Sequence, residues 1–84
     1  MYIFVFASLT TANRVRFHIK NKIGILFDIN KISGQGELPG CSYGIYVKEP
    51  YRHSVEDIVK SLDVNLIGIY NEETLKGVKG NGVS

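Results

Sequence analysis

The sequence predicts one α+β domain whose strands and helices follow one another in the order βαββαβ. The chain has 84 residues, which is enough for one hydrophobic core but not for a second domain. Hydrophobic residues make up 44% and charged residues 21%, a balance typical of globular chains and not of disordered or coiled-coil ones. Short apolar runs of strand composition also alternate with two segments of helical periodicity. We expect residues 1–71 to form the domain and residues 72–84 to be a flexible tail, because the tail has little apolar content.

The first strand is expected over residues 2–7, which are rich in aromatic and β-branched side chains. Ser8 and Thr10 are both candidate N-caps for the helix that follows. The apolar side of this helix carries residues at three- and four-residue steps, namely Leu9, Ala12, Val15 and Ile19. Phe17 lies away from that stripe, so it either covers the edge of the core, which we favour, or belongs to a contact surface.

A second strand is predicted over residues 23–30, because Ile, Phe and Leu favour a strand there and Gly24 weakens a longer helix. Residues 33–42 contain three glycines and a proline, which predicts a long connection. The third strand is expected over residues 43–49, and it should stop at Pro50, which has no N–H for a sheet ladder.

The second helix is predicted to open at Ser54, because Ser54 and Asp57 have the spacing of a capping box. Its apolar residues again recur at helical steps, namely Val55, Ile58, Val59 and Leu62. A fourth strand is expected over residues 66–70.

Right-handed crossovers place both helices on one face of an antiparallel sheet, which is the ferredoxin-like arrangement with strand order 4-1-3-2. This topology has a consequence for the position of the one cysteine. The connection between the second and third strands lies at the same end of the sheet as the start of the first helix. We therefore expect Cys41 near residues 8–11, and Arg52 and His53 at the opposite end.

Cys41 is the candidate functional residue. As the one cysteine of the chain it cannot form an intrachain disulfide, and it lies late in the glycine-rich connection. The start of the first helix, at Ser8, Thr10 and Thr11, would stabilise its thiolate through the helix dipole. Such a thiol can carry persulfide or selenide, form a mixed disulfide or be oxidised to a sulfenic acid. The alternative is a small apolar residue that is buried under the third strand and inert.

The sequence also resembles a small bacterial family described as selenium/sulfur carrier-like proteins. The resemblance spans residues 1–70 and rests on four features: the opening Tyr-Ile-Phe-Val-Phe strand, the basic helix after it, Gly24-Ile25, and the segment Pro39-Gly40-Cys41-Ser42-Tyr43-Gly44. It implies that the loop residues Gly40, Ser42 and Gly44 support a sulfur- or selenium-carrying Cys41. Ser42 departs from the family, in which a glycine commonly follows the cysteine. The resemblance further implies a carrier or accessory protein, and not an enzyme, that is served by a sulfur- or selenium-donor protein.

The sheet face away from the helices gives an alternative function as a non-catalytic interaction module. Period-two alternation would point Ile3, Val5, Ile45, Val47, Ile67 and Ile69 toward the helices. It would then gather aromatic side chains on the other face, namely Tyr2, Phe4, Phe6, Tyr46 and Tyr70. An aromatic face calls for a cover, which we expect to be a second copy of the chain in a homodimer. Single-stranded RNA is the weaker option, because residues 43–49 offer little of the RNA-binding strand pattern.

Charge and residue spacing argue against several other functions. The net charge is +2, which is too small to indicate nucleic acid by itself. Residues 1–27 carry four basic residues and no acids, and we interpret the basic residues as a solvated helix face. Nucleic acid is therefore an improbable partner. His18, His53 and Cys41 lack metal-ligand spacing, so we expect no metal and no cofactor. No apolar run reaches the length of a membrane span, and no leader pattern is present, which predicts a cytoplasmic protein without a membrane partner.

Overall fold

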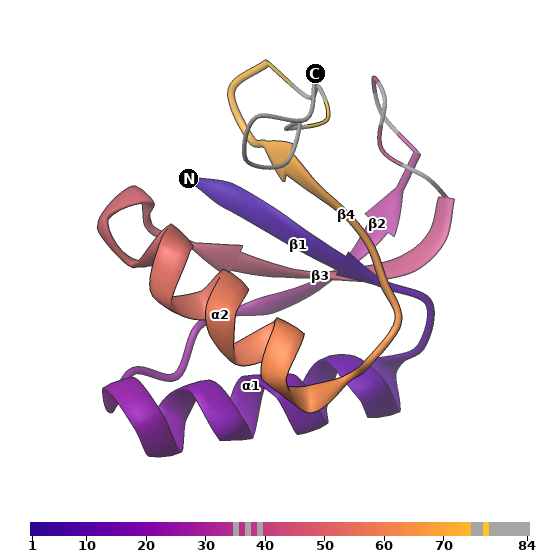
Figure 1. Ribbon diagram of the computed structural model, residues 1–84. Coiled ribbons are helices and arrows are strands. Elements are labelled where there is room, and N and C mark those ends of the chain that lie inside the picture. Colours follow the sequence, from indigo (N-terminus) through magenta and orange to yellow (C-terminus); the bar gives the residue numbers. More distant parts are fainter. Residues whose placement is uncertain (35, 37, 39, 75–76, 78–84) are drawn as a thin grey trace.

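Four antiparallel strands form one sheet, and two helices cover one of its faces in the computed structural model (Figure 1). The structure describes residues 1–34, 36, 38, 40–74 and 77. The elements in chain order are β1 (Tyr2–Phe6), α1 (Leu9–Ile23), β2 (Ile29–Ser33), β3 (Gly40–Val47), the 3-10 helix η1 (Glu49–Tyr51), α2 (Arg52–Leu62) and β4 (Leu66–Asn71). The spatial order is β2-β3-β1-β4. This confirms the predicted α+β class and the strand order of the ferredoxin-like arrangement.

α1 is capped at both ends by its own sequence. Of the two candidate N-caps, Ser8 is the one used, since its Oγ accepts a hydrogen bond from the Thr11 N–H at 3.1 Å. At the other end Gly24 takes the left-handed conformation, with φ of 86°, and its N–H donates to the Lys20 carbonyl at 2.8 Å. Thr10 lies inside the first turn of the helix.

The predicted apolar stripe of α1 is largely confirmed. Ala12, Val15 and Ile19 are fully buried against the sheet. Leu9 is 45% exposed because it is the first helical residue, and its prediction as a core residue is wrong. Phe17 is 54% exposed, so it does not cover the edge of the core as we favoured.

Several helix and strand ends differ from those predicted. α1 runs to Ile23, where the second strand was predicted to begin, and Gly24 ends the helix. β2 starts only at Ile29. β3 starts at Gly40, three residues before the predicted strand, and it ends at Val47. α2 starts at Arg52 after the turn of η1, so Ser54 lies inside the helix and the predicted capping box is absent from this helix start.

The sheet has apolar side chains on both faces. The larger cluster lies between sheet and helices, and its buried members are Phe4, Phe6, Ala12, Val15, Ile19, Phe27, Ile45, Val47, Val55, Ile58, Val59 and Ile69. The smaller cluster lies on the far face and contains Ile3, Val5, Ile32 and Leu38. The four C-terminal residues of β1 are therefore buried, which fits a strand that has neighbours on both sides and covered faces above and below.

The predicted flexible tail is described only in part. Residues 72–74 form a turn in which the Asn71 Oδ1 accepts hydrogen bonds from the N–H groups of Glu73 and Thr74. Gly77 pairs with Tyr70 in an isolated antiparallel bridge. Residues 75–76 and 78–84 lie outside the described residues, so the flexibility of the tail stays a prediction.

Candidate functional site

Cys41 is an exposed free thiol in an unusual backbone conformation. It is the second residue of β3, and its φ of 55° lies in the left-handed region. The pairing of β2 with β3 shifts at this point, since Ile32 pairs with Ser42 while Ser33 pairs with Gly40. Cys41 is thus the extra residue of a β-bulge, a position where a residue in the left-handed conformation is usually glycine. It lies in an irregular strand end and not in the predicted loop.

The sheet register places this bulge at the end of the sheet where α1 begins. β1 and β3 pair antiparallel, with Phe6 opposite Tyr43. If that register continued, the next two residues of each strand would bring position 8 opposite position 41. Ser8 is the N-cap of α1, so the bulge and the helix start leave the sheet at the same end (Figure 1). Arg52 begins α2 after the other end of β3, as predicted for the opposite end.

The predicted supporting residues of Cys41 have different surroundings. Gly40 is exposed, and a Cβ added to it would meet nothing within 4 Å. Ser42 is only 1% exposed and packs into the sheet. Gly44 is required for packing, because a Cβ there would lie 2.5 Å from Cγ2 of Ile3 and 2.8 Å from Cδ1 of Ile32. The glycine thereby lets two side chains of neighbouring strands close over the backbone of β3.

The predicted aromatic face is wrong for β1. Phe4 and Phe6 are fully buried in the cluster between sheet and helices, and Tyr2 packs against the same cluster. The guanidinium carbon of Arg52 lies 4.9 Å from the centre of the Tyr2 ring, which is a cation–π distance. All residues of β1 are apolar or aromatic, so alternation alone could not show which set faces the helices.

Two of the five predicted aromatics do lie on the far face. Tyr46 and Tyr70 pack against the smaller cluster, beside Ile3 and Val5, which are almost completely buried. The exposed aromatic area that motivated a homodimer or RNA partner is therefore smaller than expected. Nothing in the structure tests either partner, and both stay predictions.

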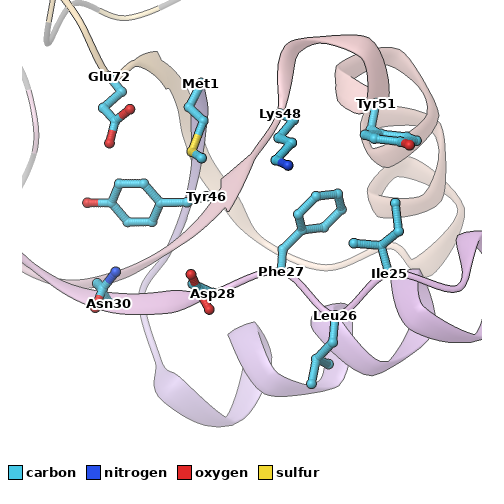
Figure 2. Close-up of a pocket in the computed structure, with 10 residues that line it drawn as sticks. All are labelled: Met1, Ile25, Leu26, Phe27, Asp28, Asn30, Tyr46, Lys48, Tyr51 and Glu72. Carbon is cyan, nitrogen blue, oxygen red and sulfur yellow. The ribbon is translucent and has the colours of Figure 1, made fainter.

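A pocket of about 760 Å³ opens at the end of the sheet opposite Cys41 (Figure 2). Its polar wall carries two carboxylates, an amide, a phenol and an ammonium group, from Asp28, Glu72, Asn30, Tyr46 and Lys48. The remaining wall is apolar or aromatic and is supplied by Met1, Ile25, Leu26, Phe27 and Tyr51. No sequence pattern indicates this site, because its walls come from four separate parts of the chain.

Backbone hydrogen bonds beyond the strand ends hold the polar wall. The Tyr46 N–H donates to the carbonyl of Asp28 at 3.0 Å, one residue before β2. The Glu72 N–H donates to the carbonyl of Met1 at 3.0 Å, one residue after β4. Burial raises the pKa of Tyr46 above its usual 10.0, and the negative charge of Glu72 adds to this effect. The Tyr46 phenol is therefore a neutral hydrogen-bond donor at pH 7.

The remaining titratable groups are arranged locally. The carboxylate of Glu56, which is buried, lies 4.0 Å from Nδ1 of His53 and 3.9 Å from Nζ of Lys60 on the same helix. Among the described residues, no group of three or more His, Cys, Asp or Glu side chains is placed to hold a metal ion. Within the same part of the chain, the helices lack the length and apolar composition to cross a membrane.

Comparison with known proteins adds no identity to these sites. No protein-family model, no curated protein and no solved structure matches the chain. The two sites therefore have to be interpreted from their own chemistry.

Proposed function

We propose that the protein is a small carrier or accessory protein that holds sulfur or selenium, or exchanges disulfides, on the Cys41 thiol. The observation that carries this proposal is the combination of exposure and backbone conformation at Cys41. A non-glycine residue in the left-handed region costs about 1 to 2 kcal/mol relative to ordinary backbone conformations. Such unfavourable local conformations concentrate at functional sites. A cysteine at a position that favours glycine is best explained by use of its thiol.

The position of the bulge supports the same proposal. An exposed sulfur at a sheet end can be reached by the active site of a donor protein without unfolding of the carrier. The start of α1 leaves the sheet at this same end, and its first turn carries no acidic side chain that would oppose a thiolate. The resemblance of residues 39–44 to selenium/sulfur carrier-like proteins points to the same chemistry.

The carrier reaction would consist of two transfers. In the loading step the Cys41 thiolate attacks the outer sulfur of a donor persulfide, the sulfur–sulfur bond of the donor breaks, and the donor leaves as a thiolate. In the delivery step an acceptor nucleophile attacks the outer sulfur of the Cys41 persulfide, and the Cys41 thiolate leaves. The two steps move one sulfur atom with no net oxidation of the carrier.

A loading and delivery experiment tests this function. The protein is mixed with a low-molecular-weight persulfide, desalted, and examined by intact-mass spectrometry before and after addition of cyanide. We expect a mass gain of one sulfur atom that disappears as thiocyanate forms, and no gain in the Cys41→Ser variant. A gain of the whole donor thiol would instead show mixed-disulfide exchange, the redox form of the proposal. No adduct of either kind would contradict both forms.

A further inference from the structure

The side of α1 that faces away from the sheet carries an inference that is independent of Cys41. We propose that this side binds single-stranded RNA, with a base stacked on Phe17 and phosphate groups at Arg14 and Lys20. α1 lies along the outside of the helix layer, where a nucleic-acid strand can reach it (Figure 1). The basic residues of α1 are then more than the solvated helix face that we predicted, because Phe17 is exposed among them.

Helix geometry gathers the residues of this side into one strip. Ala12, Val15 and Ile19 bury the opposite side of α1 against the sheet. At about 100° per residue, Phe17 lies nearly opposite the middle of that buried stripe. The residues one turn before and one turn after Phe17 complete what we call the outer strip, which consists of Asn13, Arg14, Phe17, Lys20 and Asn21.

The exposure of Phe17 indicates a contact surface. Its side chain is 54% exposed, more than any other large apolar side chain among the described residues. The core does not explain this position, because α1 already buries its apolar stripe on the other side. An aromatic ring that is held on a helix and open to water offers a stacking surface to the flat face of an unpaired base.

The neighbours of Phe17 on the outer strip supply the polar contacts of a nucleotide. Arg14 and Lys20 are exposed, and their cationic groups donate hydrogen bonds to phosphate oxygens. Asn21 is exposed and Asn13 is half-buried, and an amide can both donate to and accept from a base edge or a ribose 2′-hydroxyl. Stacking, phosphate and amide contacts thus lie within two turns of one helix.

The charge of α1 favours a polyanion. Residues 1–27 contain no acidic residue, and the helix carries four Arg or Lys side chains, at positions 14, 16, 20 and 22. In the part of the chain that the structure describes, the ion pairs within 4 Å join Glu56 to His53 and Lys60. The basic side chains of α1 are therefore not neutralised by such a pair, and phosphate groups can exchange their counterions for them.

The composition of the outer strip favours RNA over other anionic partners. Helices that dock on anionic membranes present a broad apolar side, whereas this strip has one aromatic ring with an amide one turn away in each direction. A protein interface would centre on a larger apolar patch than one ring. A duplex keeps its bases stacked on one another, so the ring selects a single strand.

Fluorescence anisotropy with a short labelled RNA tests the proposal. The probe is an RNA of about twelve nucleotides, mixed in sequence and without self-complementarity. We expect saturable binding that weakens about sevenfold from about 50 mM to about 200 mM salt, because two phosphate contacts on a single strand give a slope of about −1.4. Duplex RNA and single-stranded DNA of the same sequence should bind more weakly. Equal or tighter binding of either one, absence of saturable RNA binding, or binding of phosphatidylserine vesicles alone would overturn the proposal.

Variants of the outer strip localise the binding. Phe17→Ala should weaken RNA binding about fivefold to 150-fold, the range for loss of one stacked base. The ring is exposed, so the variant should keep the fold, which circular dichroism checks. Ile67→Ala is the matched control, because it truncates another exposed apolar side chain, on β4, and no change is expected. Unchanged affinity in Phe17→Ala, or an equal loss in Ile67→Ala, would contradict the assignment.

The salt dependence separates phosphate contacts from a general effect of charge. Arg14→Gln and Lys20→Gln should each reduce the magnitude of the salt slope by about 0.7. Lys31→Gln removes an exposed basic side chain from β2 and should leave the slope unchanged. The same slope in all three variants and the parent protein would show that α1 makes no phosphate contact, and would overturn the proposal.

Discussion

Replacement of Cys41 by glycine should stabilise the protein, because the backbone at this position favours glycine. The φ of 55° costs a side-chain-bearing residue about 1 to 2 kcal/mol. Glycine avoids that cost but loses about 0.5 to 1 kcal/mol through the greater freedom of its unfolded chain. The net gain is about 0.5 to 1 kcal/mol, which in a domain of this size raises the melting temperature by about 2 to 8 °C.

The assay compares Cys41→Gly with Cys41→Ala by thermal and urea unfolding under reducing conditions. The side chain is exposed, so neither variant loses buried contacts, and the difference between them isolates the backbone conformation. Cys41→Ala keeps the left-handed strain and should unfold close to the parent protein. If Cys41→Gly is no more stable than Cys41→Ala, the strain argument for a functional cysteine is refuted.

Three further predictions address the core, the helix cap and the pocket. Gly44→Ala should lower the free energy of unfolding by about 1 to 3 kcal/mol, because the new methyl group overlaps Ile3 and Ile32, and equal stability in urea unfolding would show that this site can relax. Ser8→Ala should cost about 1 kcal/mol through loss of the cap to Thr11, measured the same way, whereas a neutral Ser8→Ala would mean that water replaces the cap. Tyr46 should ionise above pH 10.0 in an absorbance titration, and Glu72→Gln should lower the pKa of Tyr46. The stability that the neutral phenol contributes is therefore complete below pH 10 and is lost as the pH rises through the folded-state pKa. An unchanged titration in Glu72→Gln would show that the charge of Glu72 does not act on Tyr46.

The order of the elements could be predicted because it depends on local signals. Apolar residues at helical steps in α1 and α2 and β-branched runs in the strands set the order βαββαβ. The handedness of the crossovers then left one arrangement, which the strand order confirms. The end of the sheet that carries Cys41 followed from this topology alone.

The details near the sites could not be predicted because they depend on contacts between distant residues. β1 is buried on both faces, so its sequence contains no alternation that would place Phe4 on one side or the other. Gly44 falls within the predicted third strand, and the resemblance gives it only a supporting role for Cys41. The closure of Ile3 and Ile32 over it shows its role in packing. The left-handed conformation of Cys41 arises from the bulge against β2. No residue type in the segment predicts that bulge.

The pocket was missed for a similar reason. Asp28 is the first acidic residue of the sequence, and Glu72 is the first residue of the predicted tail. They come to the same pocket because β2 starts and β4 ends at one end of the sheet. The available signal was that Asp28 lies just before β2 and Glu72 just after β4. Together with the strand order, this would have indicated a polar site at that end of the sheet.

The central claim is that the fold presents Cys41 for sulfur transfer. The most direct test compares the rate of persulfide formation on the folded protein with that on a peptide of residues 38–44, with the same donor and pH. The proposal predicts a faster reaction on the folded protein, because the bulge exposes Cys41 at the end of the sheet where α1 starts. An equal or slower reaction would show that the fold does nothing for this thiol, and the carrier function would lose its structural support.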